Sequence, residues 1–311
     1  MGDSRDPEVL VIGAACIDVK GRPLQPLRFS TSNQGLIRLS PGGAGRNIAE
    51  NLARLGVRTN LLSVVGTDNY GRTILEETNA AGVCMEHVRV APGKPSAIYL
   101  AVLDENGHMA VSVDAMECLE LLNPPYIYAN RYLIEQASMV VVDANLSTKT
   151  LGTVLALAKR YDVPVCMTTV SVSLARKVRR YLKDYHIVIG NLDEGSALCG
   201  KPLADVDDAI IGAREMVATG TKLVIITLGA HGLVYASSTG SGYIPAIQCD
   251  IVDATGAGDA LAAGVIYGYL NDFPIDEALR VGVSAATLTL TCRDTVCQEL
   301  DQETLYQRMV I

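Results

Sequence analysis

The chain has 311 residues, of which 49% are hydrophobic and 19% are charged, and its formal net charge is −8. This composition supplies enough apolar side chains for a large buried core. The acidic balance, the two phenylalanines and the lack of tryptophan argue against nucleic acid as a partner, because such a partner needs basic surface and stacking aromatic rings.

Several features of the sequence indicate where in the cell the protein is found. No apolar run reaches the ~18 residues that a membrane span needs, and residues 1–8 are polar, unlike a signal peptide. The eight cysteines form no metal-type CxxC pairs, and several lie in apolar runs. We therefore expect a cytoplasmic protein with reduced cysteines and no membrane partner.

Apolar strands alternate with amphipathic helices along the chain. Runs rich in Val and Ile predict buried strands, and helical patterns separate them. This alternation is typical of a parallel sheet covered on both faces. The predicted strands are 9–13, 61–66, 139–143, 163–167, 187–190 and 223–227, and the predicted helices are 46–55, 71–80, 148–160, 205–218 and 260–270.

Two stretches break this alternation. Residues 14–40 form a charged insertion that contains proline, and residues 96–116 indicate a β-hairpin. The hairpin is predicted because Asn106-Gly107, a strong turn signal, separates two β-prone runs. Asp18 lies in the first stretch, soon after a buried strand, where polar residues often face a ligand. Its carboxylate could accept hydrogen bonds from hydroxyl groups, and a solvated loop residue is the alternative.

A glycine-rich turn, Pro41-Gly42-Gly43-Ala44-Gly45-Arg46-Asn47, comes next. It leads into an amphipathic helix that a C-terminal glycine, Gly56, ends.

Asn191-Leu192-Asp193-Glu194 follows the strand 187–190. Its oxygen-bearing side chains suit Mg²⁺, which prefers oxygen ligands and keeps several waters. The same residues also fit a plain helix N-terminus, with Asn191 as the cap and acidic residues in the first turn. From the sequence alone both interpretations stay open.

Thr227-Leu228-Gly229-Ala230-His231-Gly232 follows the strand 223–227. Gly229 and Gly232 would let the backbone approach a ligand closely, although a plain β-turn has the same composition.

The segment Asp253-Ala254-Thr255-Gly256-Ala257-Gly258-Asp259 is the most informative of the chain. It follows an apolar, β-prone stretch, 243–252, and runs directly into a predicted helix. The small residues Gly256–Gly258 allow backbone N–H groups to converge on an anion, and the helix adds its N-terminal amides and dipole. Beside such a site, Asp259 could take a proton from a hydroxyl that attacks phosphorus. The alternative is a turn whose aspartate only caps a helix.

Together, the segments 41–56 and 253–259 resemble the paired signatures of the PfkB (ribokinase-like) carbohydrate kinases, and the resemblance extends from Val9 to about Thr295. It implies a ribokinase-like three-layer α/β/α core with a mostly parallel sheet plus a small β-sheet lid. We expect a single kinase domain over residues 1–311, with a lid formed by about 14–40 and 96–116. Because such lids are often shared across a dimer, the resemblance also implies a homodimer.

The resemblance implies a role for each motif. Asp259 would be the catalytic base, and Gly256, Ala257 and Gly258 would form the anion hole. Asp18, Gly43 and Asn47 would bind the hydroxyl groups of a sugar.

The same resemblance implies ATP and Mg²⁺ as cofactors, with Glu194 in the outer shell of the metal. K⁺ is a further candidate, held by backbone carbonyls near Asp253 and Thr255. The nucleotide-binding residues implied are Thr227, Gly229, Gly232 and Asn191.

Within the family, residues 18–23, 39–51 and the tail 286–296 most resemble kinases that phosphorylate the ribose 5′-hydroxyl of pseudouridine. Lys20, Ser96 and Asp114 are candidates for reading the base. Ribokinase or another sugar or nucleoside kinase of the family is the alternative acceptor class.

Two other functions are less consistent with the sequence. A non-catalytic sugar-binding relative would not need Asp259 and the intact Gly256–Gly258. A Rossmann-type oxidoreductase would carry its glycine motif early, and Leu261 occupies the position of the third glycine.

Overall fold

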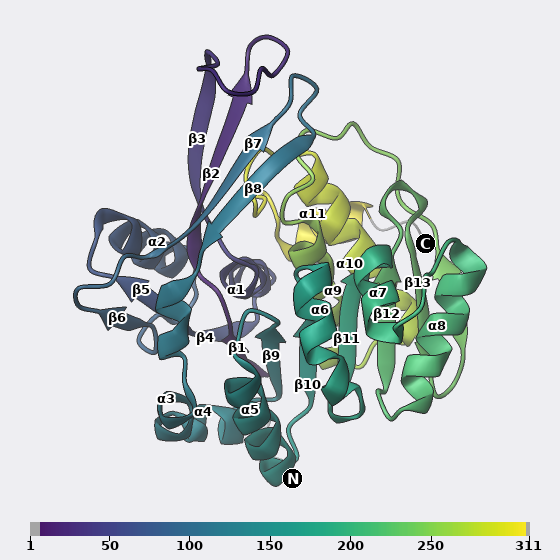
Figure 1. The fold of residues 1–311 in the computed structure, drawn as a ribbon. Coiled ribbons are helices and arrows are strands. Elements are labelled where there is room, and N and C mark those ends of the chain that lie inside the picture. The colour runs from purple at the N-terminus through teal and green to yellow at the C-terminus, as the bar shows by residue number, and fades with distance from the viewer. Residues whose placement is uncertain (1–6, 309–311) are drawn as a thin grey trace.

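The computed structural model describes residues 7–308 and is built around one large sheet (Figure 1). From β12 to β4 the neighbouring strands are parallel, and only β13 and β14 are antiparallel. In spatial order the strands are β14 (Ser241–Ile244), β13 (Leu233–Ser237), β12 (Leu223–Thr227), β11 (Ile187–Asn191), β10 (Val165–Thr168), β9 (Met139–Asp143), β1 (Glu8–Ile12) and β4 (Arg58–Leu62).

Two apolar cores lie on opposite faces of this sheet. Alternate strand residues point to opposite sides, so Leu10 and Ile12 join one core while Val9 and Val11 join the other. The first core contains α3 (Pro124–Ala129), α4 (Arg131–Gln136), α5 (Thr148–Tyr161), α6 (Val172–Val178), α7 (Leu192–Cys199) and α8 (Val206–Ala218). The second contains α1 (Ala44–Arg54), α2 (Asn69–Ala80), α9 (Ala257–Leu270), α10 (Ile275–Leu290) and α11 (Gln302–Arg308). The predicted three-layer α/β/α core is therefore confirmed.

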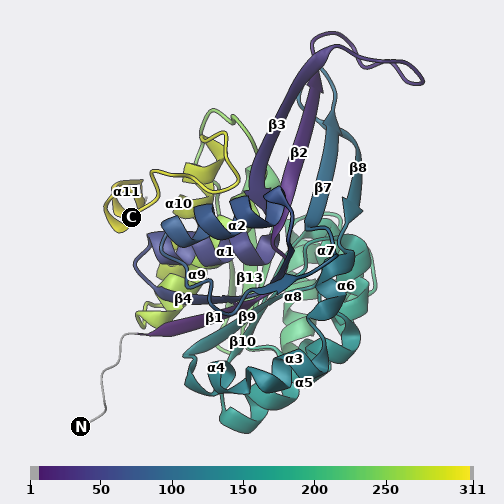
Figure 2. The ribbon, with the colours of Figure 1, turned by 90° about the vertical axis from the view of Figure 1, so that its left-hand side faces the viewer.

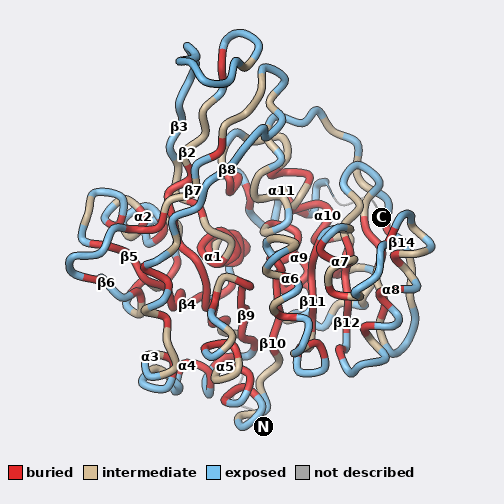
Figure 3. Tube along the Cα trace, in the orientation of Figure 1, coloured by how far each residue is buried: buried red, intermediate tan, exposed pale blue. Residues whose placement is uncertain are grey.

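A second, four-stranded sheet projects from this body (Figures 1 and 2), and we call it the small sheet. Most of its outer residues are exposed, whereas the buried residues gather in the central layers (Figure 3). Its strands, in spatial order, are β3 (Gly35–Gly42), β2 (Cys16–Pro23), β7 (Ala97–Leu103) and β8 (Met109–Ala115). They come from the two stretches that break the alternation in the sequence.

The predicted hairpin turn is present between β7 and β8. The Asp104 carboxylate accepts hydrogen bonds from the backbone N–H groups of Asn106 and His108 at 2.9 and 2.8 Å. Gly107 has φ 89°, a conformation that glycine adopts readily. The remaining elements are short: β5 (Val64–Gly66) pairs with β6 (Arg89–Ala91), and three 3₁₀ helices are η1 (Glu117–Leu121), η2 (Arg179–Asp184) and η3 (Gly229–His231).

Three expectations differ from the structure. The predicted strand 61–66 is divided, because its first residues belong to β4 of the large sheet and Val64–Gly66 form β5, which pairs with β6. The apolar stretch 243–252 is a strand only as far as Ile244, and its later residues run without regular structure. Cys292 and Cys297 are joined by a disulfide, so the expectation of reduced cysteines is wrong for this pair, while the other cysteines are free. Among residues 7–308, no helix is both long and apolar enough to cross a bilayer.

Candidate active site

The segment Gly256–Gly258, expected to form an anion hole, lies at the start of α9. Gly256 is the N-cap residue with φ 85°, and no side chain caps this helix end. A Cβ atom on Gly256 would collide with the backbone carbonyl of Thr295, so only glycine allows the loop after α10 to pack here. Because the first amides of a helix lack partners within the helix, this end of α9 is suited to an anion.

Asp259 lies in the first turn of α9, and Asn47 of α1 contacts it. The side-chain amide of Asn47 donates to Asp259 Oδ2 at 2.8 Å. The orientation of this amide is fixed, because Asn47 Oδ1 accepts from Arg46 at 2.9 Å and from Thr295 Oγ1 at 3.4 Å. The two glycine-rich segments, about 200 residues apart in the sequence, thus meet at the proposed base.

The surroundings raise the pKa of Asp259 to about 7. The main cause is burial, which disfavours the ionised form, and the nearby Asp143 and Asp18 carboxylates act in the same direction. The hydrogen bond from Asn47 and the charge of Arg46 oppose this shift. A carboxyl group with a pKa near neutrality is well matched to general base catalysis.

Asp143 connects several backbone segments of the site through hydrogen bonds. This fully buried carboxylate, at the end of β9, accepts backbone hydrogen bonds from Ala14 at 2.6 Å, from Gly45 at 3.1 Å and from Asn145 at 2.9 Å. It therefore joins the loop after β1 to the start of α1. Burial raises its pKa.

Arg46 supports the same region from α1. It is nearly buried, which lowers its pKa to about 10, and it forms an ion pair with Glu50. Its guanidinium donates to the Pro41 carbonyl at 2.7 Å and to Asn47. Neither Asp143 nor Arg46 was assigned a role from the sequence. The position of Asp143 at the carboxyl end of a buried strand was an available signal.

Asp18 is buried in β2 beside the glycine turn. Burial raises its pKa, while a hydrogen bond from Cys16 and the charges of Lys20 and Arg46 oppose the rise. A Cβ atom on Gly42 would overlap the Asp18 carboxyl group, and one on Gly43 would overlap the backbone of Ala14. The glycines therefore let the end of β3 close over Asp18.

A polar row crosses the small sheet from Asp18. The register places Asp18 opposite Tyr99 in β7, and Tyr99 opposite Asp114 in β8. Residues that lie directly opposite each other share a face of the sheet. With strands ~4.8 Å apart, Asp114 lies about 10 Å from Asp18. Of the other base-reading candidates, Ser96 is buried and donates to Asp68 at 2.6 Å.

The predicted nucleotide-binding turn and the anion hole line one cavity of about 300 Å³. Its walls are mostly apolar and include residues after β14, so the apolar side chains of that stretch line a cavity. The lining residues include Thr227, Gly229, Gly232, Ile247, Ile251, Ala257, Gly258 and Leu290.

Asn191 and Glu194 form a capping box at the start of α7. Asn191 Oδ1 accepts from the Glu194 amide, and Glu194 Oε2 accepts from the Asn191 amide, both at 2.9 Å. Thr169 also donates to Glu194 at 2.6 Å. The capped helix N-terminus, one of the two interpretations that the sequence allowed, is thus present. Glu194 is a nearly buried carboxylate at the carboxyl end of β11, so it is also a suitable oxygen group for the hydrated Mg²⁺.

Asp253 and Thr255 contact Lys20, which lies in β2 of the small sheet. The Lys20 ammonium group is 2.6 Å from Asp253 Oδ2 and 2.8 Å from Thr255 Oγ1. From the sequence, Lys20 was a candidate for reading the base of the acceptor. Its pairing with Asp253 was not predicted, because 233 residues separate the two partners.

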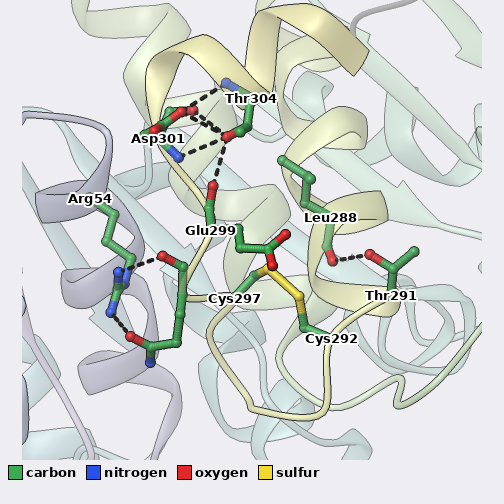
Figure 4. The surroundings of a disulfide bond; sticks show 9 residues. Arg54, Leu288, Thr291, Cys292, Cys297, Glu299, Asp301 and Thr304 are labelled. Carbon is green, nitrogen blue, oxygen red and sulfur yellow. Dashed lines mark hydrogen bonds between the residues drawn. A yellow bond between two sulfur atoms is a disulfide. The ribbon is translucent and has the colours of Figure 1, made fainter.

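The disulfide closes the loop that packs on the anion hole (Figure 4). Between Cys292 and Cys297, Thr295 donates to the Pro41 carbonyl at 3.0 Å. Asp294 of the same loop pairs with Arg38 of β3 at 2.5 Å. This loop therefore contacts Gly256, the glycine turn and the small sheet together.

The family model for pfkB family carbohydrate kinases matches residues 6–300. The chain belongs to the PfkB family of carbohydrate kinases. Pseudouridine kinase of Escherichia coli strain K12 is 34% identical over 92% of this PfkB chain and 91% of its own length. A carbohydrate kinase from Agrobacterium tumefaciens has a TM-score of 0.81 and 27% identity, with 97% of each chain covered.

The structure of Arabidopsis thaliana ribokinase with ribose and ATP has a TM-score of 0.87 and 20% identity, and covers 98% of this chain and 99% of that chain. It confirms the ribokinase-like fold. This PfkB protein is thus a carbohydrate or nucleoside kinase, and family membership implies that ATP is its phosphate donor.

Proposed function

We propose that this PfkB kinase transfers the γ-phosphoryl group of ATP to the 5′-hydroxyl of pseudouridine. The observation that carries the proposal is Asp259, a carboxyl group with a pKa of about 7 beside the anion hole and held by Asn47. The match of 34% to pseudouridine kinase supports the choice of acceptor.

In the proposed mechanism, Asp259 takes the proton of the acceptor hydroxyl as its oxygen attacks the γ-phosphorus in line. The amides of Gly256–Gly258 stabilise the charge on the transferring group. ATP would lie in the cavity that the turn 227–232 lines. Mg²⁺, when bound with ATP, neutralises phosphate charge, and we propose that Asn191 and Glu194 hold its water ligands.

The small sheet would act as a lid over the acceptor. In this proposal Asp18 and the turn containing Gly43 bind the ribose hydroxyls, and closure excludes the water that would otherwise hydrolyse ATP. Asn47, expected in the sugar grip, already donates to Asp259, so its main role would be to orient the base. K⁺ is not part of the proposal, because the Lys20 ammonium group already brings a positive charge to this loop, at the side chains of Asp253 and Thr255.

We propose Asp114 as the residue that reads the base. It lies on the polar row with Asp18, at about the distance that separates a ribose from the far edge of its base. Its carboxylate can accept the additional N–H of the C-nucleoside, which uridine lacks. A site that hydrogen-bonds such a group discriminates strongly against the analogue without it.

A coupled ATP-consumption assay with pseudouridine, uridine, guanosine, ribose and a hexose phosphate tests the proposal. We expect kcat/KM for pseudouridine to exceed that for uridine by at least about 100-fold. Asp114→Ala, which removes the acceptor oxygens, should remove most of this preference and leave turnover of uridine unchanged, because the ribose contacts stay intact. Ser112→Ala, on the same face of β8, is the control. A preference for free ribose would identify a ribokinase instead.

A further inference from the structure

Lys20 is a nearly buried charge that the proposed transfer does not use. Its side chain is 13% exposed and extends from the small sheet to the loop before the anion hole, where it pairs with Asp253. Within the register, Lys20 faces Arg38 of β3 and Ala101 of β7. A lysine that extends from the small sheet to this loop fixes the position of the small sheet relative to the loop.

The Asp253 carboxylate connects this ammonium group to the backbone. Its Oδ1 accepts from the Thr255 amide at 2.9 Å, while its Oδ2 is bound by Lys20. Burial raises the pKa of Asp253, but the hydrogen bonds from Lys20 and Thr255 outweigh it and lower the pKa below its ordinary value. Thr255 directly precedes Gly256, so the ammonium group contacts the residue next to the anion-hole amides.

Asp253 and Thr255 are also the residues beside which the family resemblance placed a monovalent cation. The Lys20 ammonium group binds one side-chain oxygen of each residue, Asp253 Oδ2 and Thr255 Oγ1, whereas the resemblance placed the cation on backbone carbonyls of the same loop. A second cation a few ångströms from Lys20 would be repelled by it in this partly buried position.

We propose that the ammonium group of Lys20 takes the place of a monovalent cation at the anion-hole loop, so that this kinase works without K⁺. Lys20 is a positioning residue, since it acts through Asp253 and Thr255 rather than on the substrate. This inference rests on the proposed phosphoryl transfer. It also links lid closure to the anion hole, because Lys20 lies in a strand of the small sheet.

The test compares the wild type with Lys20→Met in KCl, NH₄Cl and choline chloride at constant ionic strength. We expect the wild-type rate to be the same in all three salts. Lys20→Met should lose about tenfold or more in kcat in choline chloride, and K⁺ or NH₄⁺ should restore much of it. The matched control is Arg38→Met, which removes another ion pair between the small sheet and the body, to Asp294, and leaves the contacts of Lys20 with Asp253 and Thr255 intact. It should stay insensitive to K⁺.

Thermal unfolding provides a second measurement that needs no acceptor. KCl should raise the Tm of Lys20→Met relative to choline chloride and leave the wild-type Tm unchanged. Wild-type activation or stabilisation by K⁺ would overturn the inference, and so would a folded Lys20→Met variant that neither K⁺ nor NH₄⁺ affects. If Lys20→Met does not fold, the wild-type salt series still decides. If no acceptor in the panel is phosphorylated, the proposed function fails, whereas the Tm series still tests Lys20.

Discussion

Asp259 has two properties that a general base for phosphoryl transfer needs. Its pKa of about 7 means that a large fraction is ionised at neutral pH, yet the carboxylate is still basic enough to accept a proton. Its orientation is set by Asn47, whose own amide is fixed by Arg46. The neighbouring carboxylates of Asp143 and Asp18 help to raise the pKa of Asp259, because their negative charge favours its protonated form.

The first prediction concerns pH and Asp259. Since the base must be ionised, kcat/KM should fall about tenfold per pH unit below pH 7. Asp259→Asn should lower kcat by ~10²–10⁴ and leave ATP affinity unchanged. The pH–rate profile and ATP titration measure these effects. Turnover near that of the wild type would remove Asp259 from its role.

The raised pKa has a consequence for stability too. Between the ordinary carboxyl pKa and about 7, the folded state keeps a proton that the unfolded state releases, so the wild type loses stability as pH rises through this window. The Asp259→Asn variant has no carboxyl group at this position and should not lose this stability. Its Tm relative to the wild type should therefore increase from pH 5 to pH 7 and then stay constant.

The second prediction concerns Asn47. Its hydrogen bond lowers the pKa of Asp259 relative to what burial alone would give. Asn47→Leu should therefore shift the acidic limb of the pH–rate profile to higher pH, which the profile of kcat/KM measures directly. Thr295→Val removes the 3.4 Å contact to Asn47 and the hydrogen bond to the Pro41 carbonyl, but it leaves the Asn47 amide on Asp259 and should shift the limb much less. An unshifted limb in a folded Asn47→Leu variant would contradict this account.

At the scale of elements, the start of α7 combines a structural and a proposed chemical role. Asn191 and Glu194 cap each other, and the cap alone would account for both residue types. The two roles differ in what they need from Glu194. Capping needs an acceptor oxygen, whereas holding the waters of Mg²⁺ also benefits from the negative charge.

The third prediction separates these roles with Glu194→Gln and Glu194→Ala. The glutamine keeps an acceptor oxygen, so only the alanine variant should lower the free energy of unfolding, by about 1 kcal/mol. Both variants should raise the Mg²⁺ concentration that gives half-maximal activity. Urea unfolding and Mg²⁺ titrations measure the two effects. If the titration of Glu194→Gln overlays the wild type, Glu194 is only a cap.

The sequence predicted those elements whose signals are local. Buried strands such as 139–143 show as apolar runs, and the turn at Asn106-Gly107 depends on two adjacent residues. The glycine motifs could be found for the same reason. The apolar residues after Ile244 were wrongly interpreted as β-strand, because residues that line an apolar cavity and residues of a buried strand have the same composition. The partners of Lys20 and Asn47 depend on tertiary packing, and no local pattern indicates them.

At the scale of the whole molecule, the small sheet has one apolar and one polar face. Asp18 and Lys20 lie on the polar face, which contacts the site. The register places the opposite side chains on a second face that stays largely exposed. Its exposed apolar residues are Ile37, Leu39, Leu100, Val111 and Val113. Exposed apolar surface of this kind, next to the free edge of β8, is typical of an interface.

The fourth prediction is that two copies pair through this apolar face. We expect the wild type to be a dimer by light scattering at micromolar concentration. Val111→Glu, which places a charge in the middle of the face, should give a monomer, because an unpaired charge is costly to bury in an interface. Ser112→Glu is the matched control, since the next residue of β8 points to the other face and is also exposed to solvent. It should remain a dimer. A monomeric wild type, or a Val111→Glu variant that stays dimeric, would show that the apolar face is not the interface.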